Sequence, residues 1–368
     1  MIDERDLAYL DMAEALAVQA LGRTSPNPHV GAVVVRRGRI VGTGFHEAAG
    51  REHAETAALR RAGKNARGAT LYLTLEPCVH WGRTPPCAES VLTSGIVRAV
   101  IAGLDPNPVI RGRGVRFLRT AGLAVDVAGR PERKSGLNEA HARYIVDRRP
   151  FVTLKSALSL DGKLATRTGE SAWISSLEAR RYAHFLRSEN DAVLVGAQTV
   201  RHDDPRLTVR PPGRRGKPVL RVVLDPGLRT PPEARLFEDP SGGPVLLYAR
   251  AGNRDWEARK ARLLRRGAEV AELPGEGPRL DLRRVLSDLG SREIAALLVE
   301  GGGRTAAGFL DEGLVDKVVL AVAPILIGGA DAVALFAGRG ADRLAAAPRL
   351  SRVSSFRLGG DLILEGYI

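Results

Sequence analysis

Four residues in the first third of the chain have the types and spacing of a metal site that performs hydrolysis. His53 and Glu55 are separated by one residue, and Cys78 and Cys87 follow them along the chain. One imidazole and two thiolates give a tetrahedral Zn²⁺ three protein ligands and leave its fourth position to water, whose pKa the metal lowers towards neutrality. We expect His53, Cys78 and Cys87 to hold one zinc ion. Glu55 would then move protons without binding the metal.

A zinc ion that only stabilises the fold is the alternative interpretation of these residues. Structural zinc sites normally have four protein ligands, and His80 is the candidate for a fourth. The pattern shows three well-spaced ligands, which favours catalysis. His-x-Glu followed by Pro-Cys-x-x-Cys is typical of zinc nucleobase deaminases. Here eight residues lie between Cys78 and Cys87, which disfavours a general nucleoside or transfer-RNA deaminase.

The long insertion between the cysteines carries a narrower resemblance. His-Ala-Glu at 53–55 and the run Glu-Pro-Cys-Val-His-Trp-Gly-Arg-Thr-Pro-Pro-Cys at 76–87 resemble the deaminase half of the bifunctional deaminase/reductase family of riboflavin biosynthesis. The resemblance implies a cytidine-deaminase-like α/β/α sandwich. It also implies hydrolytic deamination of 2,5-diamino-6-ribosylamino-4(3H)-pyrimidinone 5′-phosphate.

Three further residues of the first half are candidates for substrate contact. The resemblance implies that Asn27, on the loop before the first strand, lines the pyrimidine pocket. Arg83 and Thr84 are polar and lie next to the cysteines in the sequence, so we assign them to the substrate as well. A structural role stays open for all three, because Asn-Pro favours turns in any protein and Gly82 to Pro86 could be a rigid turn.

The second half continues the same resemblance, with runs at 151–163, 169–175 and 199–210 that resemble the reductase half of the family. This implies a dihydrofolate-reductase-like α/β domain that uses NADPH to reduce the ribosyl group, giving 5-amino-6-ribitylamino-uracil 5′-phosphate. The cofactor contacts that it implies are Ala157, Trp173, Thr199, Asp203, Gly302, Gly303, Arg304, Thr305, Ala306, Ala307 and Gly308. The substrate contacts that it implies are Ser171, Arg187, Leu207, Arg210 and Glu300.

Elementary chemistry supports part of this assignment. A strand over 294–300 runs into Gly301-Gly302-Gly303 and a helix predicted over 306–312, and a glycine turn before a helix N-terminus suits a phosphate. Arg187 and Arg210 have the side chains that bind phosphate bidentately. Lys155 and Asp161 are open candidates for the acid that completes the reduction, and either could equally be structural.

The elements predicted around these residues alternate between strands and helices, which indicates an α/β protein. The predicted strands span 30–35, 40–45, 69–75, 97–103, 123–127, 151–157, 192–195 and 294–300. The predicted helices span 3–22, 53–64, 87–94, 112–121, 131–149, 176–188 and 306–312. A charged stop before Pro150 places the boundary between two domains, 1–148 and 149–368.

Composition narrows the classes of function. The chain of 368 residues has a net charge of +13 and only two cysteines, so a reducing, cytoplasmic location is expected. No apolar run has transmembrane length and no signal peptide is evident. The basic residues are scattered among acidic ones, which favours phosphorylated small molecules over nucleic acid; a nucleic-acid-binding protein with a structural zinc is the rival interpretation. We expect a homo-oligomer, with a contact in the Gly/Ala-rich connection 324–340.

Overall fold

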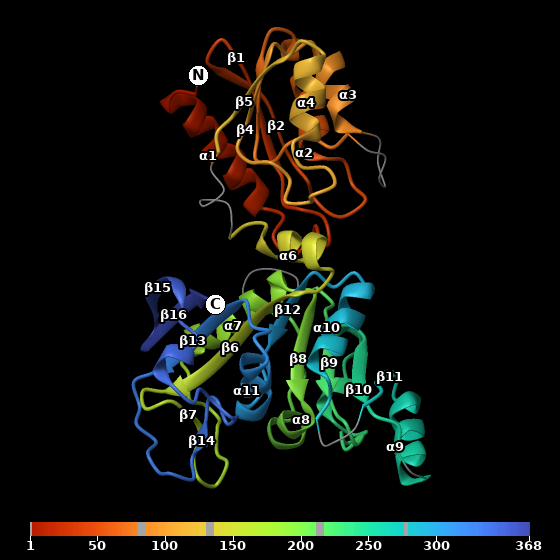
Figure 1. Cartoon of the computed structure of the whole chain (residues 1–368), viewed down its shortest axis with the longest axis vertical. Coiled ribbons are helices and arrows are strands. Elements are labelled where there is room, and N and C mark those ends of the chain that lie inside the picture. The colour runs from red at the N-terminus through yellow and green to blue at the C-terminus, as the bar shows by residue number, and fades with distance from the viewer. Residues whose placement is uncertain (1, 80–85, 130–135, 211–216, 253, 276–278) are drawn as a thin grey trace. The chain divides into compact units, whose positions relative to one another are not determined.

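The computed structural model describes residues 2–79, 86–129, 136–210, 217–252, 254–275 and 279–368. By their contacts these residues form two units, Met1–Arg148 and Arg149–Ile368, which are considered separately (Figure 1). Within the described ranges, no helix combines the length and apolar character that crossing a membrane requires.

The first unit is built on one five-stranded sheet with the order β2-β1-β3-β4-β5. β1 is antiparallel to β2 and β3, whereas β3, β4 and β5 are parallel. The strands are β1 (Gly31–Arg36), β2 (Arg39–Phe45), β3 (Thr70–Leu73), β4 (Arg98–Ile101) and β5 (Ala124–Val127). The helices are α1 (Glu4–Val18), α2 (Ala54–Ala62), α3 (Cys87–Thr93), α4 (Arg113–Thr120) and α6 (Glu139–Asp147), with a 3₁₀ turn at Gly63–Ala66.

The side chains on the two faces of this sheet pack in two separate hydrophobic cores. Val33 and Tyr72 pack with Leu10 of α1 on one face. Val34 and Leu71 pack on the other face with side chains of α2, α3 and α4. Because side chains alternate along a strand, each strand serves both cores. The five-stranded α/β/α sandwich predicted from the sequence is therefore confirmed.

The second unit has a nine-stranded sheet with the order β11-β10-β9-β8-β12-β6-β13-β16-β15. The strands are parallel from β11 to β13, and β16 and β15 add an antiparallel edge. Its strands are β6 (Phe151–Ser159), β8 (Ala192–Gly196), β9 (Leu220–Leu224), β10 (Val245–Ala249), β11 (Ala268–Glu272), β12 (Ala296–Val299), β13 (Lys317–Ala323), β15 (Ser351–Leu358) and β16 (Asp361–Tyr367). A separate two-stranded ribbon pairs β7 (Lys163–Ala165) with β14 (Val333–Ala334).

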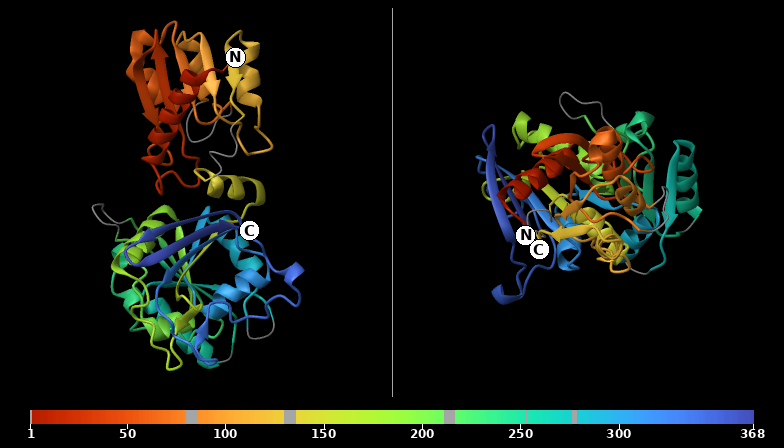
Figure 2. Two further views of the ribbon diagram at one scale, coloured as in Figure 1. Left: turned by 90° about the vertical axis from the view of Figure 1, so that its left-hand side faces the viewer. Right: turned by 90° about the horizontal axis from the view of Figure 1, so that it is seen from above.

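Helices cover both faces of this larger sheet. The helices are α7 (Leu177–Glu189), α8 (Ala197–Asp203), α9 (Arg254–Arg265), α10 (Leu282–Ser291) and α11 (Gly303–Asp311), with 3₁₀ turns at Arg235–Phe237, Pro240–Gly242 and Leu344–Ala346. Apolar side chains of α7 and α9 join one core, and those of α10 and α11 join the other. The edge strand β15, dark blue at the margin of the unit, is exposed along almost its whole length (Figures 1 and 2).

The second unit contains elements that the sequence analysis did not predict: the helices α8, α9 and α10, and the strands β7, β9, β10, β11, β13, β14, β15 and β16. In the first unit α1 ends at Val18, four residues before its predicted end. Two further helices begin at other residues than predicted. α11 begins at Gly303, three residues before the predicted start, because Gly302 adopts the extended backbone of an N-cap. The helix predicted over 131–149 is α6, and its described part begins at Glu139, preceded by a turn. Residues 130–135 lie outside the described part of the chain.

Both ends of the second unit are held by one side chain and its backbone. Asp316, just before β13, accepts two hydrogen bonds of 3.0 Å from the Arg149 guanidinium and one of 2.8 Å from the backbone N–H of Val152. The carbonyl of Asp316 also accepts from the N–H of Ile368, the last residue. The first and last residues of the unit thus meet at the same point.

Candidate active sites

The three predicted zinc ligands come together in the first unit. The Nδ1 atom of His53 lies 3.0 Å from Cys87 Sγ and 3.7 Å from Cys78 Sγ, and all three donor atoms lie within 4.8 Å of one another. Ligand atoms placed tetrahedrally around Zn²⁺ at ordinary Zn–N and Zn–S lengths are separated by about 3.5 Å. The donor set and its spacing therefore fit a zinc ion.

Local packing places these ligands. His53 is the N-cap of α2, and this helix lies directly on β2. A Cβ added to Gly44 would come 2.4 Å from the Ala54 carbonyl oxygen, and one added to Gly42 would come 2.3 Å from that of Ala58. Only glycine permits an approach this close. The spacing of these glycines therefore brings His53 to its position at the sheet.

A buried carboxylate supports the loop that carries Cys78. The side chain of Glu76 accepts backbone hydrogen bonds of 2.7–3.3 Å from four N–H groups, those of Asp105, Gly112, Gly114 and Val115. Two of these donors belong to the first turn of α4, whose unpaired amides suit a negative charge. The sequence analysis missed this role of Glu76, although its place beside Pro77-Cys78 was a signal.

The electrostatics of the site suit a proton carrier beside thiolate ligands. Glu55 is buried, and burial raises the pKa of its carboxyl group, countered in part by the charge of His53. The pKa of Cys78 is lowered, first by its hydrogen bond with Cys87 and then by that with His53. The backbone N–H of Cys87 also donates to Cys78 Sγ over 3.3 Å. The pKa of Cys87 is raised, first by its hydrogen bond with Cys78 and then by burial, so the negative charge of this pair lies on Cys78.

Asn27 reaches the metal ligands through one intermediate residue. Its Nδ2 lies 3.2 Å from Nε2 of His46, and Nδ1 of His46 lies 3.1 Å from the carbonyl of Glu52. The ring of His46 meets that of His53 edge to face at 5.1 Å between centroids. The structure therefore brings Asn27 to the neighbourhood of the ligands. The other candidates, His80, Arg83 and Thr84, lie outside the described residues.

The second unit contains a cavity of about 900 Å³ at the ends of β6, β8 and β12. Ten of the predicted site residues line it: Ala157, Ser171, Trp173, Arg187, Thr199, Asp203, Leu207, Arg210, Glu300 and Gly302. In the described structure the remaining run, 303–308, forms the start of α11 and does not line this cavity. The runs that were separate in the sequence thus converge on one site.

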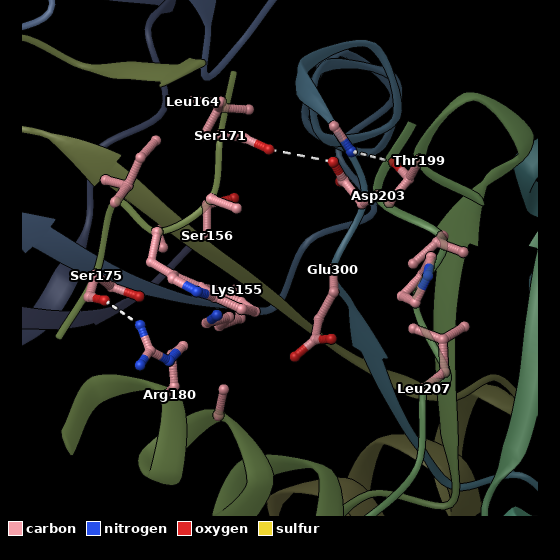
Figure 3. Close-up of a pocket in the computed structure, with 18 of the residues that line it drawn as sticks. Lys155, Ser156, Leu164, Ser171, Ser175, Arg180, Thr199, Asp203, Leu207 and Glu300 are labelled. Carbon is pink, nitrogen blue, oxygen red and sulfur yellow. Dashed lines mark hydrogen bonds between the residues drawn. The ribbon is translucent and has the colours of Figure 1, made fainter. Parts of the chain in front are cut away.

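A buried ion pair lies at the centre of this cavity. Arg187 donates to Oε2 of Glu300 from Nε and Nη2, over 3.0 and 2.6 Å, and to the carbonyl of Thr208 from Nη1. The other carboxylate oxygen, Oε1, is buried without a hydrogen-bond partner among the described residues. Burial alone would raise the pKa of Glu300, but the charges of Arg187 and Lys155 outweigh it and lower this pKa. Lys155 and Glu300 both extend into the space between the labelled side chains (Figure 3).

Cationic side chains around the cavity extend beyond the two arginines that were predicted. Arg180, Arg181, Arg206 and Arg235 also line it. The guanidinium of Arg180 lies 4.5 Å from the centroid of the Trp173 ring. The pKa of Arg210 is lowered, first by burial and then by repulsion from neighbouring arginines. Crowded guanidinium groups of this kind suit an anionic ligand. The sequence analysis did not select the four additional arginines.

The glycine turn is fixed by a hydrogen bond and by close packing. The N–H of Gly302 donates to Thr199 Oγ1 over 3.3 Å, which joins two of the predicted cofactor contacts. A Cβ on Gly303 would lie 2.2 Å from the carbonyl oxygen of Ala334. Ser171 Oγ donates to Asp203 over 3.1 Å, also among the predicted contacts. These residues therefore place hydroxyl groups, a carboxylate and an indole on the wall of the cavity where a nicotinamide cofactor is expected.

Asp161 makes the contacts of a structural residue, which is one of the two roles that the sequence left open for it. Its carboxylate accepts the backbone N–H groups of Ile327 and Gly328 over 3.0 and 2.7 Å. With the hydroxyl of Ser159 as the main cause, these bonds lower the pKa of Asp161 to about 2. A group that is ionised throughout the physiological range is a poor acid. Asp161 holds a loop, and Lys155 remains the candidate acid.

Comparison with known proteins agrees with both sites. Residues 3–103 match the model of the cytidine and deoxycytidylate deaminase zinc-binding region, and residues 150–364 match that of the RibD C-terminal domain. The riboflavin biosynthesis protein RibD of Aquifex aeolicus is 48% identical over 89% of this chain and 89% of its own. The protein of the same name from Escherichia coli is 37% identical, covering 96% of this chain and 97% of its own.

Solved structures agree over nearly the whole chain. Acinetobacter baumannii RibD superposes with a TM-score of 0.87 at 33% identity, covering 99% of both chains. A diaminohydroxyphosphoribosylaminopyrimidine deaminase/5-amino-6-(5-phosphoribosylamino)uracil reductase from Thermotoga maritima superposes with a TM-score of 0.86 at 35% identity, covering 98% of both. With the zinc-ligand cluster in one unit and the reductase cavity in the other, the chain belongs to the RibD family of bifunctional deaminases/reductases of riboflavin biosynthesis.

Proposed function

We propose that the first unit hydrolyses the exocyclic amine of 2,5-diamino-6-ribosylamino-4(3H)-pyrimidinone 5′-phosphate, and that the second reduces the ribosyl group of the product with NADPH. The product of both steps is 5-amino-6-ribitylamino-uracil 5′-phosphate. The observation that carries the proposal is the meeting of His53, Cys78 and Cys87 beside the buried Glu55. The family to which the chain belongs supplies the substrate class.

The residues of the first unit divide the work of deamination. His53, Cys78 and Cys87 would hold a zinc ion, which would lower the pKa of a bound water towards neutrality. Glu55, with the raised pKa that burial gives it, takes a proton from the attacking water and passes it to the leaving amine. A carboxyl group with a raised pKa holds a proton more readily than an ordinary one and is suited to both transfers. Asn27 orients the pyrimidine, with its side-chain amide held by His46.

The residues of the second unit orient the ribose and its phosphate. The residues around Thr199, Asp203 and the glycine turn would hold NADPH, which would supply the hydride. Oε1 of Glu300, which has no partner among the described residues, accepts from the ribose hydroxyls. Arg210 and the other arginines of the cavity wall hold the phosphate. Lys155, whose pKa burial lowers, donates the proton that completes the reduction.

The surroundings of the enzyme follow from the same features. Both cysteines of the chain are zinc ligands and must stay reduced, so we place the reaction in the cytoplasm.

Strand β15 presents Val353 and Phe356, with 57% and 39% of their surfaces exposed, at the open edge of the large sheet. An edge with apolar side chains readily pairs with another chain, and this supports a homo-oligomer. The substrate is a phosphorylated small molecule, with no part for nucleic acid or a membrane.

The test measures metal and turnover together. The expected result is about one zinc per chain, with NADPH oxidised in the presence of either the diaminopyrimidine substrate or its deaminated product. Oxidation with the deaminated product alone would contradict the proposed deamination while supporting the reductase. The absence of oxidation with both would refute the proposal for the second unit.

A further inference from the structure

A short segment between the two family matches is bound to the loop that carries Asn27. The matched regions end at 103 and begin again at 150, so residues 137–141 belong to neither. Within this segment Asn138 makes a reciprocal pair of hydrogen bonds with one residue of the loop. The N–H of His29 donates to Asn138 Oδ1 over 2.7 Å, and Asn138 Nδ2 donates to the His29 carbonyl over 3.0 Å.

Two imidazoles complete the attachment. Nδ1 of His29 lies 3.1 Å from the carbonyl oxygen of Leu137, and Nδ1 of His141 lies 2.9 Å from that of Pro26. Because a carbonyl oxygen only accepts, both rings must carry their proton on Nδ1. The residues on either side of Asn27 and Pro28 are thereby bound to residues more than a hundred positions away.

Asn138 makes this contact in place of its usual local one. It is the N-cap of α6, a position where asparagine normally accepts from the first backbone amides of its own helix. Here its side chain makes no capping hydrogen bond. Both Oδ1 and Nδ2 of the side chain bind the backbone of His29 instead, in the way that a neighbouring β-strand pairs with a backbone N–H and carbonyl.

The loop held in this way leads to the metal ligands. Asn27 donates from Nδ2 to His46, whose ring is fixed by the Glu52 carbonyl and packs against the ring of His53. We propose that Asn138 is a positioning residue of the deaminase site, which fixes the loop 26–29 and through it the amide of Asn27. The inference rests on the proposed function, because it takes Asn27 as a contact of the pyrimidine.

The experiment uses the full chain loaded with zinc and compares Asn138→Ala with Val146→Ala. Val146 lies on the same helix with 51% of its surface exposed, so its variant is the matched control. Loss of both hydrogen bonds to His29 is expected to raise KM for deamination about tenfold, with a smaller effect on kcat. Asn138→Asp keeps the acceptor but not the donor, and its KM should lie between those of wild type and Asn138→Ala.

Two further measurements separate positioning from general stability. Zinc content and the KM for reduction of the deaminated substrate should match wild type in Asn138→Ala. Hydrogen exchange at the backbone amide of His29 should become faster in this variant and stay unchanged in Val146→Ala.

A KM for deamination equal to that of the control would overturn the inference, as would a parallel loss of zinc and of both activities. Unchanged exchange at His29 would overturn it without reference to any substrate. If the wild-type chain released no ammonia, the proposed deamination would fail instead, and the exchange measurement would still decide whether Asn138 holds the loop.

Discussion

Replacement of Arg187 by methionine should destabilise the second unit through the charge that it leaves behind. Arg187 and Glu300 have only 15% and 9% of their side-chain surfaces exposed. Removing one partner of a buried pair costs about 3–5 kcal/mol, because the remaining charge has lost its compensation. The charge of Lys155 still favours ionised Glu300, so the lower end of that range is expected.

Calorimetry at neutral pH measures this cost. For a unit of this size each kcal/mol shifts Tm by about 2–4 °C, so a cost of about 3 kcal/mol in Arg187→Met should lower the transition of the second unit by roughly 6–12 °C. The transition of the first unit should not move. The double variant Arg187→Met/Glu300→Gln removes the charge as well and should recover most of the loss without recovering reductase activity.

The loss of stability in Arg187→Met should depend on pH, because it depends on the ionisation of Glu300. In wild type the lowered pKa of Glu300 stabilises the fold above the unfolded pKa of about 4.3, and this is lost as pH falls through the folded value. In Arg187→Met burial dominates and raises that pKa, so the penalty is largest at high pH and shrinks as pH falls. A penalty that is independent of pH, or a double variant no more stable than the single one, would refute the reasoning.

Three further variants test other contacts. Glu55→Gln should lower deamination by about 10²–10⁴ with zinc content and NADPH oxidation on the deaminated substrate unchanged; a smaller loss would contradict the proton transfer. Gly303→Ala places a Cβ 2.2 Å from the Ala334 carbonyl and should weaken NADPH binding at least about tenfold, measured by titration of cofactor fluorescence. Asp6, whose pKa is lowered by Arg98 against the effect of burial, stabilises the first unit above its unfolded pKa. The gap in urea midpoints between wild type and Asp6→Asn should therefore close as pH falls through the folded value, and a gap that persisted would contradict it.

Local patterns were sufficient to predict the strands and helices of the first unit and the zinc ligands, but only five elements of the second unit. Strands such as β1 and β4 are short apolar runs between turns, and this signal lies entirely within a few residues. His53, Cys78 and Cys87 were recognisable because a metal site needs particular residue types. The start of α11 was misplaced because glycine has a low helix propensity, whereas at Gly303 close packing against Ala334 outweighs it.

The contacts between distant residues could not be predicted in this way. Glu76 accepts from amides about thirty to forty positions ahead, and Arg187 pairs with Glu300 across 113 positions. Periodicity describes which face of an element is buried but not which element lies against it. From the sequence alone, a polar residue whose partner is remote therefore cannot be distinguished from an ordinary surface residue.

The first and last residues of the second unit both contact Asp316, and this affects how the unit can be joined to other domains. Arg149, at the point where the chain enters, and Ile368, at its end, are bound to the side chain and the carbonyl of the same residue. A unit whose ends coincide tolerates insertion and circular permutation, since its internal contacts do not depend on where the chain is cut. A short peptide from Ile368 to Arg149, with new ends in an exposed loop, should give a permuted reductase. If the reductase unit came first in a fusion, the linker to the next domain would start at Ile368, close to Arg149, where the chain now enters the unit.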